Sequence, residues 1–317
     1  MARLIETIED LKKYIVVSAT FDFKKVLPHS ERVERELIFD LIGLEQYDTL
    51  VVHTLVPDSS APIDQVKKLF QEAMSNLALL EALPTINILI TNSGTKSVEA
   101  EKAVAADWKD KRDLSRSLLK IYNKAIDYAF QIMEENKTVF PEWVASKYYT
   151  IFKELIVQQT SQFNEHYSIK KNRQTFIALR PIMSEIEDQF LKGMLGECTL
   201  DFLKTQSNEP IVLKAQKEAR KAVVAFTVAK AAITGTFEFT DSSFTVASDQ
   251  LPWEKQQVLS KEDRNDLKAD RETAGAEYLK SLKKIIVDNP LIFTCYEDKI
   301  EKGINDKIIR KKSGLFL

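Results

Sequence analysis

The chain is poor in glycine and proline, and it has no long apolar run. Only 8 glycines and 9 prolines occur in 317 residues, which disfavours a turn-rich all-β fold and favours long helices. The longest apolar stretch, residues 222–229, is far shorter than the roughly 20 residues that cross a bilayer. The first ten residues carry acidic side chains where a signal peptide needs a basic start. We therefore expect no membrane partner, and synthesis and folding in the cytoplasm.

The residue types that carry most catalytic and metal chemistry are few and widely spaced. The two cysteines, Cys198 and Cys295, have no metal-binding spacing, and we interpret them as buried hydrophobic residues in a reducing compartment. None of the three histidines lies three or four positions from another, so no metal site is expected. Glycine-rich phosphate loops and the Gly-x-Ser-x-Gly motif are also missing. We therefore expect no cofactor and no catalytic residue, and we do not expect an enzyme.

Charge of either sign is not in excess. The formal net charge is −2, and 29% of the residues are charged. A protein whose main task is to coat nucleic acid would carry a strong basic excess. The near-neutral net charge therefore argues against a protein that coats nucleic acid. It does not exclude a local basic patch on the surface.

What the chain does contain is a sequence that occurs twice. Residues 7–50 align without a gap with residues 160–203, at a separation of 153 positions. Random pairing would give about two or three identities over such a length, at roughly one match in twenty. The identical pairs include Thr7 and Thr160, Tyr14 and Tyr167, Phe23 and Phe176, Pro28 and Pro181, Glu34 and Glu187, Gly43 and Gly196, Asp48 and Asp201, and Leu50 and Leu203. The repeat predicts two copies of one helical module, each of about 150 residues.

Each copy predicts the same series of helices. Thr7 and Thr160 are candidate N-caps of a short first helix, and Asp22 and Thr175 of the second. The second helix contains a proline, at which it either begins or kinks. Its apolar residues follow helical spacing up to a glycine, where a left-handed C-cap is expected. A third helix opens at a proline in each copy, and a long charged helix, residues 98–136 or 261–287, closes each copy.

Between the third and the last helix of each copy lies a segment with strand character. Residues 85–98 and 236–247 alternate apolar and polar side chains around a turn, which predicts a β-hairpin insertion. Because a lone hairpin is marginally stable in water, each must pack on its own module or pair with a neighbouring subunit. The candidate contact residues for the second alternative are Ile88, Ile90, Asn92, Phe237, Phe239 and Phe244.

The predicted organisation is mainly α, with a first module over residues 1–145, a second over 146–302 and a C-terminal tail over 303–317. The tail combines basic and apolar side chains. It is either a frayed terminus or a docking segment for a partner. The candidate docking residues are Ile308, Ile309, Arg310, Lys311, Lys312, Leu315, Phe316 and Leu317.

The repeated pattern resembles a known family. The segments SQFNEHYSI, NRQTFIALRP and IEDQFLKGMLG of the second copy, together with residues 4–52 of the first, resemble a two-copy family of Bacteroidetes prophages and crAss-like phages. That family is similar to the head-to-tail adaptor (connector) proteins of tailed phages. The resemblance implies a structural virion protein that forms a homo-oligomeric ring beneath the portal, with about twelve copies by the usual portal symmetry. The implied partners are the portal protein, further ring or tail proteins, and DNA that passes through the lumen without sequence-specific binding.

Two other functions remain open from the sequence. The first is an intracellular helical scaffold or regulator that binds one protein partner through the hairpins or the tail. The second is an enzyme with an unrecognised site at the junction of the two modules, which would require a deep pocket with several convergent polar groups.

Overall fold

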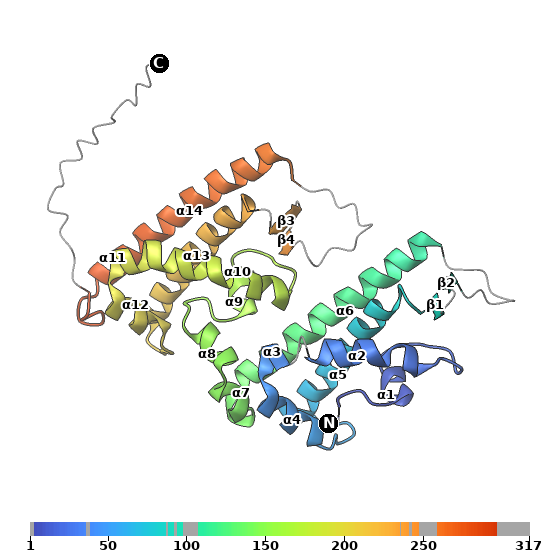
Figure 1. Ribbon diagram of the computed structural model, residues 1–317. Coiled ribbons are helices and arrows are strands. Elements are labelled where there is room, and N and C mark those ends of the chain that lie inside the picture. Colours follow the sequence, from blue (N-terminus) through green and yellow to red (C-terminus); the bar gives the residue numbers. More distant parts are fainter. Residues whose placement is uncertain are drawn as a thin grey trace, which may run out of the picture.

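The computed structural model describes residues 3–35, 39–86, 88–91, 94–97, 107–234, 236–240, 243–246 and 259–296. Over these residues the chain is mainly helical, as the composition predicts, and the helices gather into two modules joined by a short helical junction (Figure 1). None of the described helices is both long enough and apolar enough to span a bilayer.

The first module contains short helices, a pair of long helices and a pair of short strands. In chain order its elements are α1 (Ile8–Lys12), the 3-10 helix η1 (Phe23–Lys25), α2 (Leu27–Val33), α3 (Phe39–Ile42), α4 (Leu44–Val52), α5 (Pro62–Ala82), β1 (Ile88–Thr91), β2 (Gly94–Ser97) and α6 (Trp108–Glu135).

The junction and the second module continue with the same kinds of element. The junction consists of η3 (Lys137–Val139), α7 (Pro141–Ala145) and α8 (Lys147–Lys153). The second module contains α9 (Thr160–Asn164), α10 (Arg173–Ile186), the π-helix η4 (Glu187–Lys192), α11 (Gly193–Leu195), α12 (Glu197–Lys204), α13 (Pro210–Ala232), β3 (Phe237–Thr240), β4 (Ser243–Val246) and α14 (Lys261–Val287).

A pair of long helices dominates each module. Helix α5 packs along α6, and α13 packs along α14 (Figure 1). The predicted openings at Pro62 and Pro210 and the predicted span of α14 are confirmed. Helix α6 begins at Trp108, after Asp107 as N-cap; residues 98–106 of its predicted span lie outside the described residues. Strands β1 and β2, and likewise β3 and β4, run antiparallel where the first helix of each pair gives way to the second.

The two prolines of the repeated second helix have different roles. Pro28 is in the first turn of α2, which follows the 3-10 helix η1 that Asp22 caps. In the first copy the proline-containing helix therefore begins at the proline. Pro181 lies inside α10, which begins nine residues after the end of α9. The predicted N-cap Thr175 is wrong: Asn172 caps α10 and accepts the backbone N–H of Thr175 at 3.0 Å. Of the predicted N-caps of the first helix, Thr7 is confirmed for α1. Thr160 is wrong, because Gln159 is the N-cap of α9.

Each repeated glycine lies at the boundary between two consecutive helices. Gly43 has φ of 81° and Gly196 has φ of 77°, so both have the positive φ of the predicted left-handed cap. The predicted left-handed C-cap itself is wrong, because their ψ values of 156° and 161° are extended and both residues are the N-cap of the following helix, α4 or α12. A side chain at either position would strain the backbone.

Each module has its own hydrophobic core. The first core is built around Phe70, Phe130 and Trp143, and Trp143 belongs to the junction helix α7. The second core begins with Leu155–Val157 and contains the aromatic residues Phe163 and Phe176. A smaller cluster around Val26 and Leu118 extends the first core.

The two cysteines are not buried hydrophobic residues, so that interpretation is wrong. Cys198 of α12 and Cys295, eight residues beyond the end of α14, form a disulfide, and both residues are exposed. No spacing pattern indicates that the two cysteines pair, because 97 positions separate them. The disulfide holds the chain beyond α14 against α12, beside the edge-to-face contact of Phe202 with Phe293.

Candidate functional site

The contact between the two modules is centred on one buried arginine. Arg173 is the first residue of α10 in the second module, and only 2% of its side chain is exposed. Its Nη1 lies 2.9 Å from Oε1 of Glu134, and its Nε lies 3.5 Å from Oδ1 of Asp127. Both carboxylates belong to α6 of the first module. The ion pairs therefore join the modules across their junction.

The surroundings of Arg173 explain how a guanidinium is tolerated there. Its central carbon lies 4.7 Å from the ring centroid of Phe130 and 5.7 Å from that of Phe176. Contacts of this type compensate part of the lost hydration of a buried cation. Burial raises the pKa of Asp127 and of Glu134, and the charge of Arg173 opposes both shifts.

Further polar contacts extend the junction along α6. Nε2 of Gln174 donates to the hydroxyl of Tyr122 at 2.9 Å. Nζ of Lys171 lies 3.3 Å from the hydroxyl oxygen of Tyr128 and 4.8 Å from its ring centroid. The segment 171–174 of the second module thus contacts α6 over more than one helical turn.

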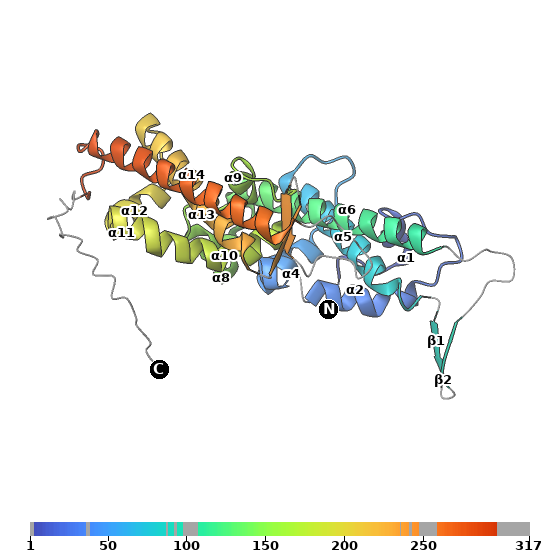
Figure 2. The same ribbon diagram turned by 90° about the horizontal axis from the view of Figure 1, so that it is seen from above.

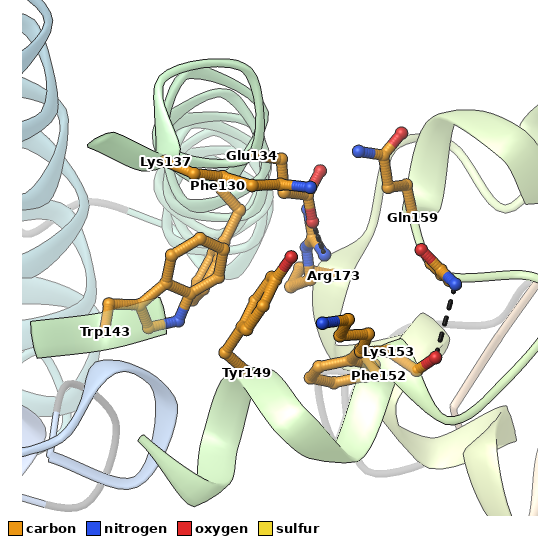
Figure 3. A pocket seen from close by; sticks show the side chains of 10 residues that line it. Phe130, Glu134, Lys137, Trp143, Tyr149, Phe152, Lys153, Gln159 and Arg173 are labelled. Carbon is orange, nitrogen blue, oxygen red and sulfur yellow. Dashed lines mark hydrogen bonds and ion pairs between the residues drawn. The ribbon is translucent and has the colours of Figure 1, made fainter. Parts of the chain in front are cut away.

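A small cavity lies beside Arg173 (Figure 3). Its volume is about 20 Å³, and residues from α6, η3, α7, α8, the segment before α9 and α10 line it. The lining residues are Phe130, Glu134, Lys137, Trp143, Tyr149, Phe152, Lys153, Gln158, Gln159 and Arg173. Pockets for small-molecule substrates measure about 300–1,000 Å³. The polar groups converge as an enzyme site would require, but the cavity is far smaller than such pockets.

The predicted hairpin residues of the second module are in its core. Phe237, Phe239 and Phe244 are at most 3% exposed. Phe244 stacks on Phe239 and contacts Phe163. The expectation that these three rings contact a neighbouring subunit is therefore wrong, because their own module already covers them. A further backbone bond, from Leu259 N–H to Phe239 O at 3.0 Å, occupies part of the outer edge of β3.

The strands of the first module are placed differently. Figure 2 shows β1 and β2 standing out from the helices, whereas β3 and β4 lie against the second module. Ile88 and Ile90 both belong to β1. The backbone bonds described for β1 are those to β2. Asn92 lies outside the described residues.

The remaining predicted site residues lie outside what the structure describes. The described chain ends at Tyr296, so the candidate docking residues Ile308–Lys312 and Leu315–Leu317 are not placed. Among the described residues, no three histidine, cysteine or acidic side chains come together as metal ligands. His53 instead lies 2.8 Å from Asp64 and ties the end of α4 to the start of α5.

Sequence reasoning missed the residues at the centre of the junction. Asp127 and Tyr128 stand out in the sequence only because an acidic residue and a tyrosine recur as Glu277 and Tyr278. Arg173 has no such signal, because its equivalent in the first copy is Thr20. Its role depends on which helix face the second module meets, and that is a property of the tertiary fold.

Comparison with known proteins identifies the repeat. One family model, described as a family of unknown function (DUF6712), matches residues 35–153 and again residues 185–304. No curated protein and no solved structure matches the chain. The two matched regions confirm that the helical unit is duplicated, and together they span more than half of the chain. The chain therefore belongs to the DUF6712 family, and it carries the family's pattern twice.

Proposed function

We propose that the protein is a structural component of a virion, which forms a ring of about twelve copies at the head-to-tail interface beneath the portal. The ring would form part of the conduit for DNA. The observation that carries this proposal is that both partners of the module junction have exposed equivalents, one in each module, among the described residues. The protein would be made in the host cytoplasm and would act in the virion.

The equivalents follow from the duplication. The junction joins α6 of the first module to residues 171–174 of the second. The helix equivalent to α6 is α14, and the segment equivalent to 171–174 is residues 18–21. In these last helices the recurring acidic residue and tyrosine, Asp127–Tyr128 and Glu277–Tyr278, give a separation of 150 positions, at which Glu272 and Glu277 correspond to Tyr122 and Asp127. Both glutamates are exposed, and so are Ser18, Ala19 and Thr20. Among the described residues, each module thus exposes the positions that correspond to its partner surface in the inner junction.

Such a pair of surfaces favours head-to-tail association. A contact between α14 of one copy and residues 18–21 of the next would be heterologous, and a repeated heterologous contact gives a closed ring or an open filament. The residue types differ from those of the inner junction, so the contact would use other side chains. The projecting strands β1 and β2 would supply a second contact, because each strand has an edge that its partner does not cover.

The resemblance of the repeated segments to one phage protein supports the ring and its position beneath the portal. The repeated segments resemble ring protein 1 of a crAss-like phage, and the copy number and the portal partner come from that resemblance alone. The net charge of −2 suits a channel wall past which DNA must slide, since strong phosphate attraction would hold the DNA. The tail, residues 303–317, would dock on the portal or on a further ring or tail protein.

The test is the mass and symmetry of the full chain, by mass photometry and negative-stain imaging, with and without its cognate portal. A closed ring of about twelve copies, free or assembled on the portal, is the expected result. A monomer that ignores the portal would refute the proposal. A one-to-one complex with a cellular protein would instead favour the scaffold or regulator.

Matched variants locate the contact. Ala19→Trp and Glu277→Arg change exposed residues of the two equivalent surfaces, and each should reduce ring formation without changing the melting temperature. Lys214→Glu is the control, because it also reverses an exposed charge on the α13–α14 pair. Rings that tolerate both end variants would show that the copies associate through other surfaces.

A further inference from the structure

The cavity at the module junction is lined mainly by hydrogen-bond donors. Figure 3 shows the hydroxyl of Tyr149 and the guanidinium of Arg173 facing the same space, with the side chains of Lys153, Lys137 and Gln159 around it. Guanidinium and ammonium groups are donors without acceptor capacity. Nζ of Lys137 also lies over the ring of Tyr149, 5.6 Å from its centroid.

One donor of this set has no partner among the described residues. Nη1 of Arg173 is bonded to Glu134, and Nε lies near Asp127, but Nη2 is buried and makes no hydrogen bond there. A buried donor without an acceptor costs about 1–3 kcal/mol, and more when it is charged. The arrangement therefore calls for an acceptor in the cavity.

The charges around the cavity decide which acceptor fits. Three cationic side chains line the space, from Lys137, Lys153 and Arg173, against the one carboxylate of Glu134. Glu134 opposes an anion, but one of its oxygens is already paired with Arg173 at 2.9 Å. The rings of Phe130, Trp143 and Phe152 belong to the lining and lower its polarity, and the indole Nε1 of Trp143 is a further buried donor without a hydrogen bond among the described residues. Low polarity strengthens the attraction between an anion and the cations.

We propose that the cavity binds a small monovalent anion, either a halide or a single carboxylate group. About 20 Å³ holds one water-sized group, since a water needs about 10–15 Å³ by the same measure. A phosphate ester or a nucleotide does not fit. The anion completes the shell of Arg173 and contacts residues of the first module, the junction and the second module, so it stabilises their contact. This site is independent of whether the chain forms rings.

The site can be tested by ³⁵Cl NMR on the full chain at fixed ionic strength, with methanesulfonate replacing chloride. Bound chloride broadens the resonance, and acetate should displace it if a carboxylate occupies the same space. Lys153→Met removes an exposed cation at the edge of the cavity and should weaken binding by about tenfold. Tyr149→Phe removes a single hydroxyl and should weaken it less. Neither variant disturbs the buried ion pairs of Arg173.

Lys147→Met is the matched control, because Lys147 is an exposed lysine of the same helix, α8, that does not line the cavity. It should leave the broadening unchanged. The absence of broadening in the unmodified chain would show that the cavity holds only water and would overturn the proposal. Broadening that survives both Lys153→Met and Tyr149→Phe would place the chloride elsewhere and would overturn it equally.

Discussion

Glu34 and Glu187, which occupy equivalent positions in the two modules, make the same buried contact with the backbone. Oε1 of Glu34 accepts the N–H of Leu4 at 3.0 Å, and Oε1 of Glu187 accepts the N–H of Ile156 at 2.6 Å. Each glutamate lies in a π-helical stretch that follows the proline-containing helix. The contact therefore fastens the entering segment of each module to its second helix, and it explains why this residue is identical in both copies.

The two glutamates differ in their second partner, which gives the first prediction. Tyr47 donates its hydroxyl to Glu34, whereas Nζ of Lys204 lies 3.1 Å from Glu187. Burial raises the pKa of both carboxyls, and their partners oppose the shift. Glu34→Gln keeps the acceptor oxygen and should change the free energy of unfolding by less than about 1 kcal/mol. Glu187→Gln leaves Lys204 without its carboxylate and should cost about 2 kcal/mol.

Urea unfolding of Glu34→Gln and Glu187→Gln measures the free energy that each variant loses. Adding Lys204→Met to each variant isolates the contribution of the ion pair between Lys204 and Glu187. The second substitution should lower the cost of Glu187→Gln and should leave that of Glu34→Gln unchanged. Equal costs for the two glutamine variants would contradict the assignment of different partners.

The buried arginine at the junction gives the second prediction. Arg173→Met leaves Asp127 and Glu134 buried without their cation, and breaking a buried pair in this way costs about 3–5 kcal/mol. Arg180→Met is the matched control on the same helix. Its side chain is 28% exposed and pairs with Glu154 at 3.2 Å, so its ion pair should contribute about 1 kcal/mol or less. Similar losses for the two variants in chemical unfolding would mean that Arg173 is dispensable for the junction.

The third prediction concerns the pH dependence of the same variant. Burial raises the pKa of Asp127 and Glu134 above their unfolded values, so the folded state takes up protons more readily. The free energy of unfolding then falls as the pH rises through the folded pKa values. Removing Arg173 raises both values further. The loss caused by Arg173→Met should therefore be smaller at about pH 5 than at about pH 7, and a loss independent of pH would contradict this account.

Local sequence signals predicted the elements whose causes are themselves local. Pro62 and Pro210 open helices because a proline in the first turn lacks only a hydrogen bond that the helix does not use there. Gly43 and Gly196 adopt a positive φ that other residues avoid. Local reasoning failed at α10, for which the sequence predicts Thr175 as the N-cap. Asn172 is the N-cap instead, about two turns before Pro181, so the proline lies inside the helix.

The junction and the disulfide depend on contacts between distant segments, and no local pattern encodes them. Arg173 meets Glu134 because α10 approaches α6 in space, although 39 positions separate the two residues. The alternation in residues 236–247 predicts strands with one covered face, but it does not say whether the same module or a neighbouring subunit covers that face. The aromatic rings of β3 and β4 are covered by their own module.

The disulfide gives the fourth prediction. Cys198 and Cys295 close a loop of 97 residues, and the chain-entropy model assigns about 4–5 kcal/mol to a loop of that length. Reduction, or Cys198→Ser or Cys295→Ser alone, should lower the free energy of unfolding by up to that amount. The double variant should lose no more than either single one. Thiol labelling and the mass of the intact chain, which falls by two hydrogens on oxidation, report whether the bond is present.

The close contact of α14 with α13 gives the last prediction. A Cβ on Gly275 would lie 2.8–2.9 Å from ring carbons of Phe226, and that ring cannot simply turn aside because it stacks on Phe190 with centroids 4.3 Å apart. Gly275→Val should therefore cost about 2–3 kcal/mol through overpacking, although valine is the better helix former. Ala276→Val, one residue further along α14 and exposed, adds the same branched side chain in open space. It should cost only about 0.6 kcal/mol, the difference in helix propensity. Thermal unfolding of the two variants decides the matter, because propensity alone ranks them in the opposite order.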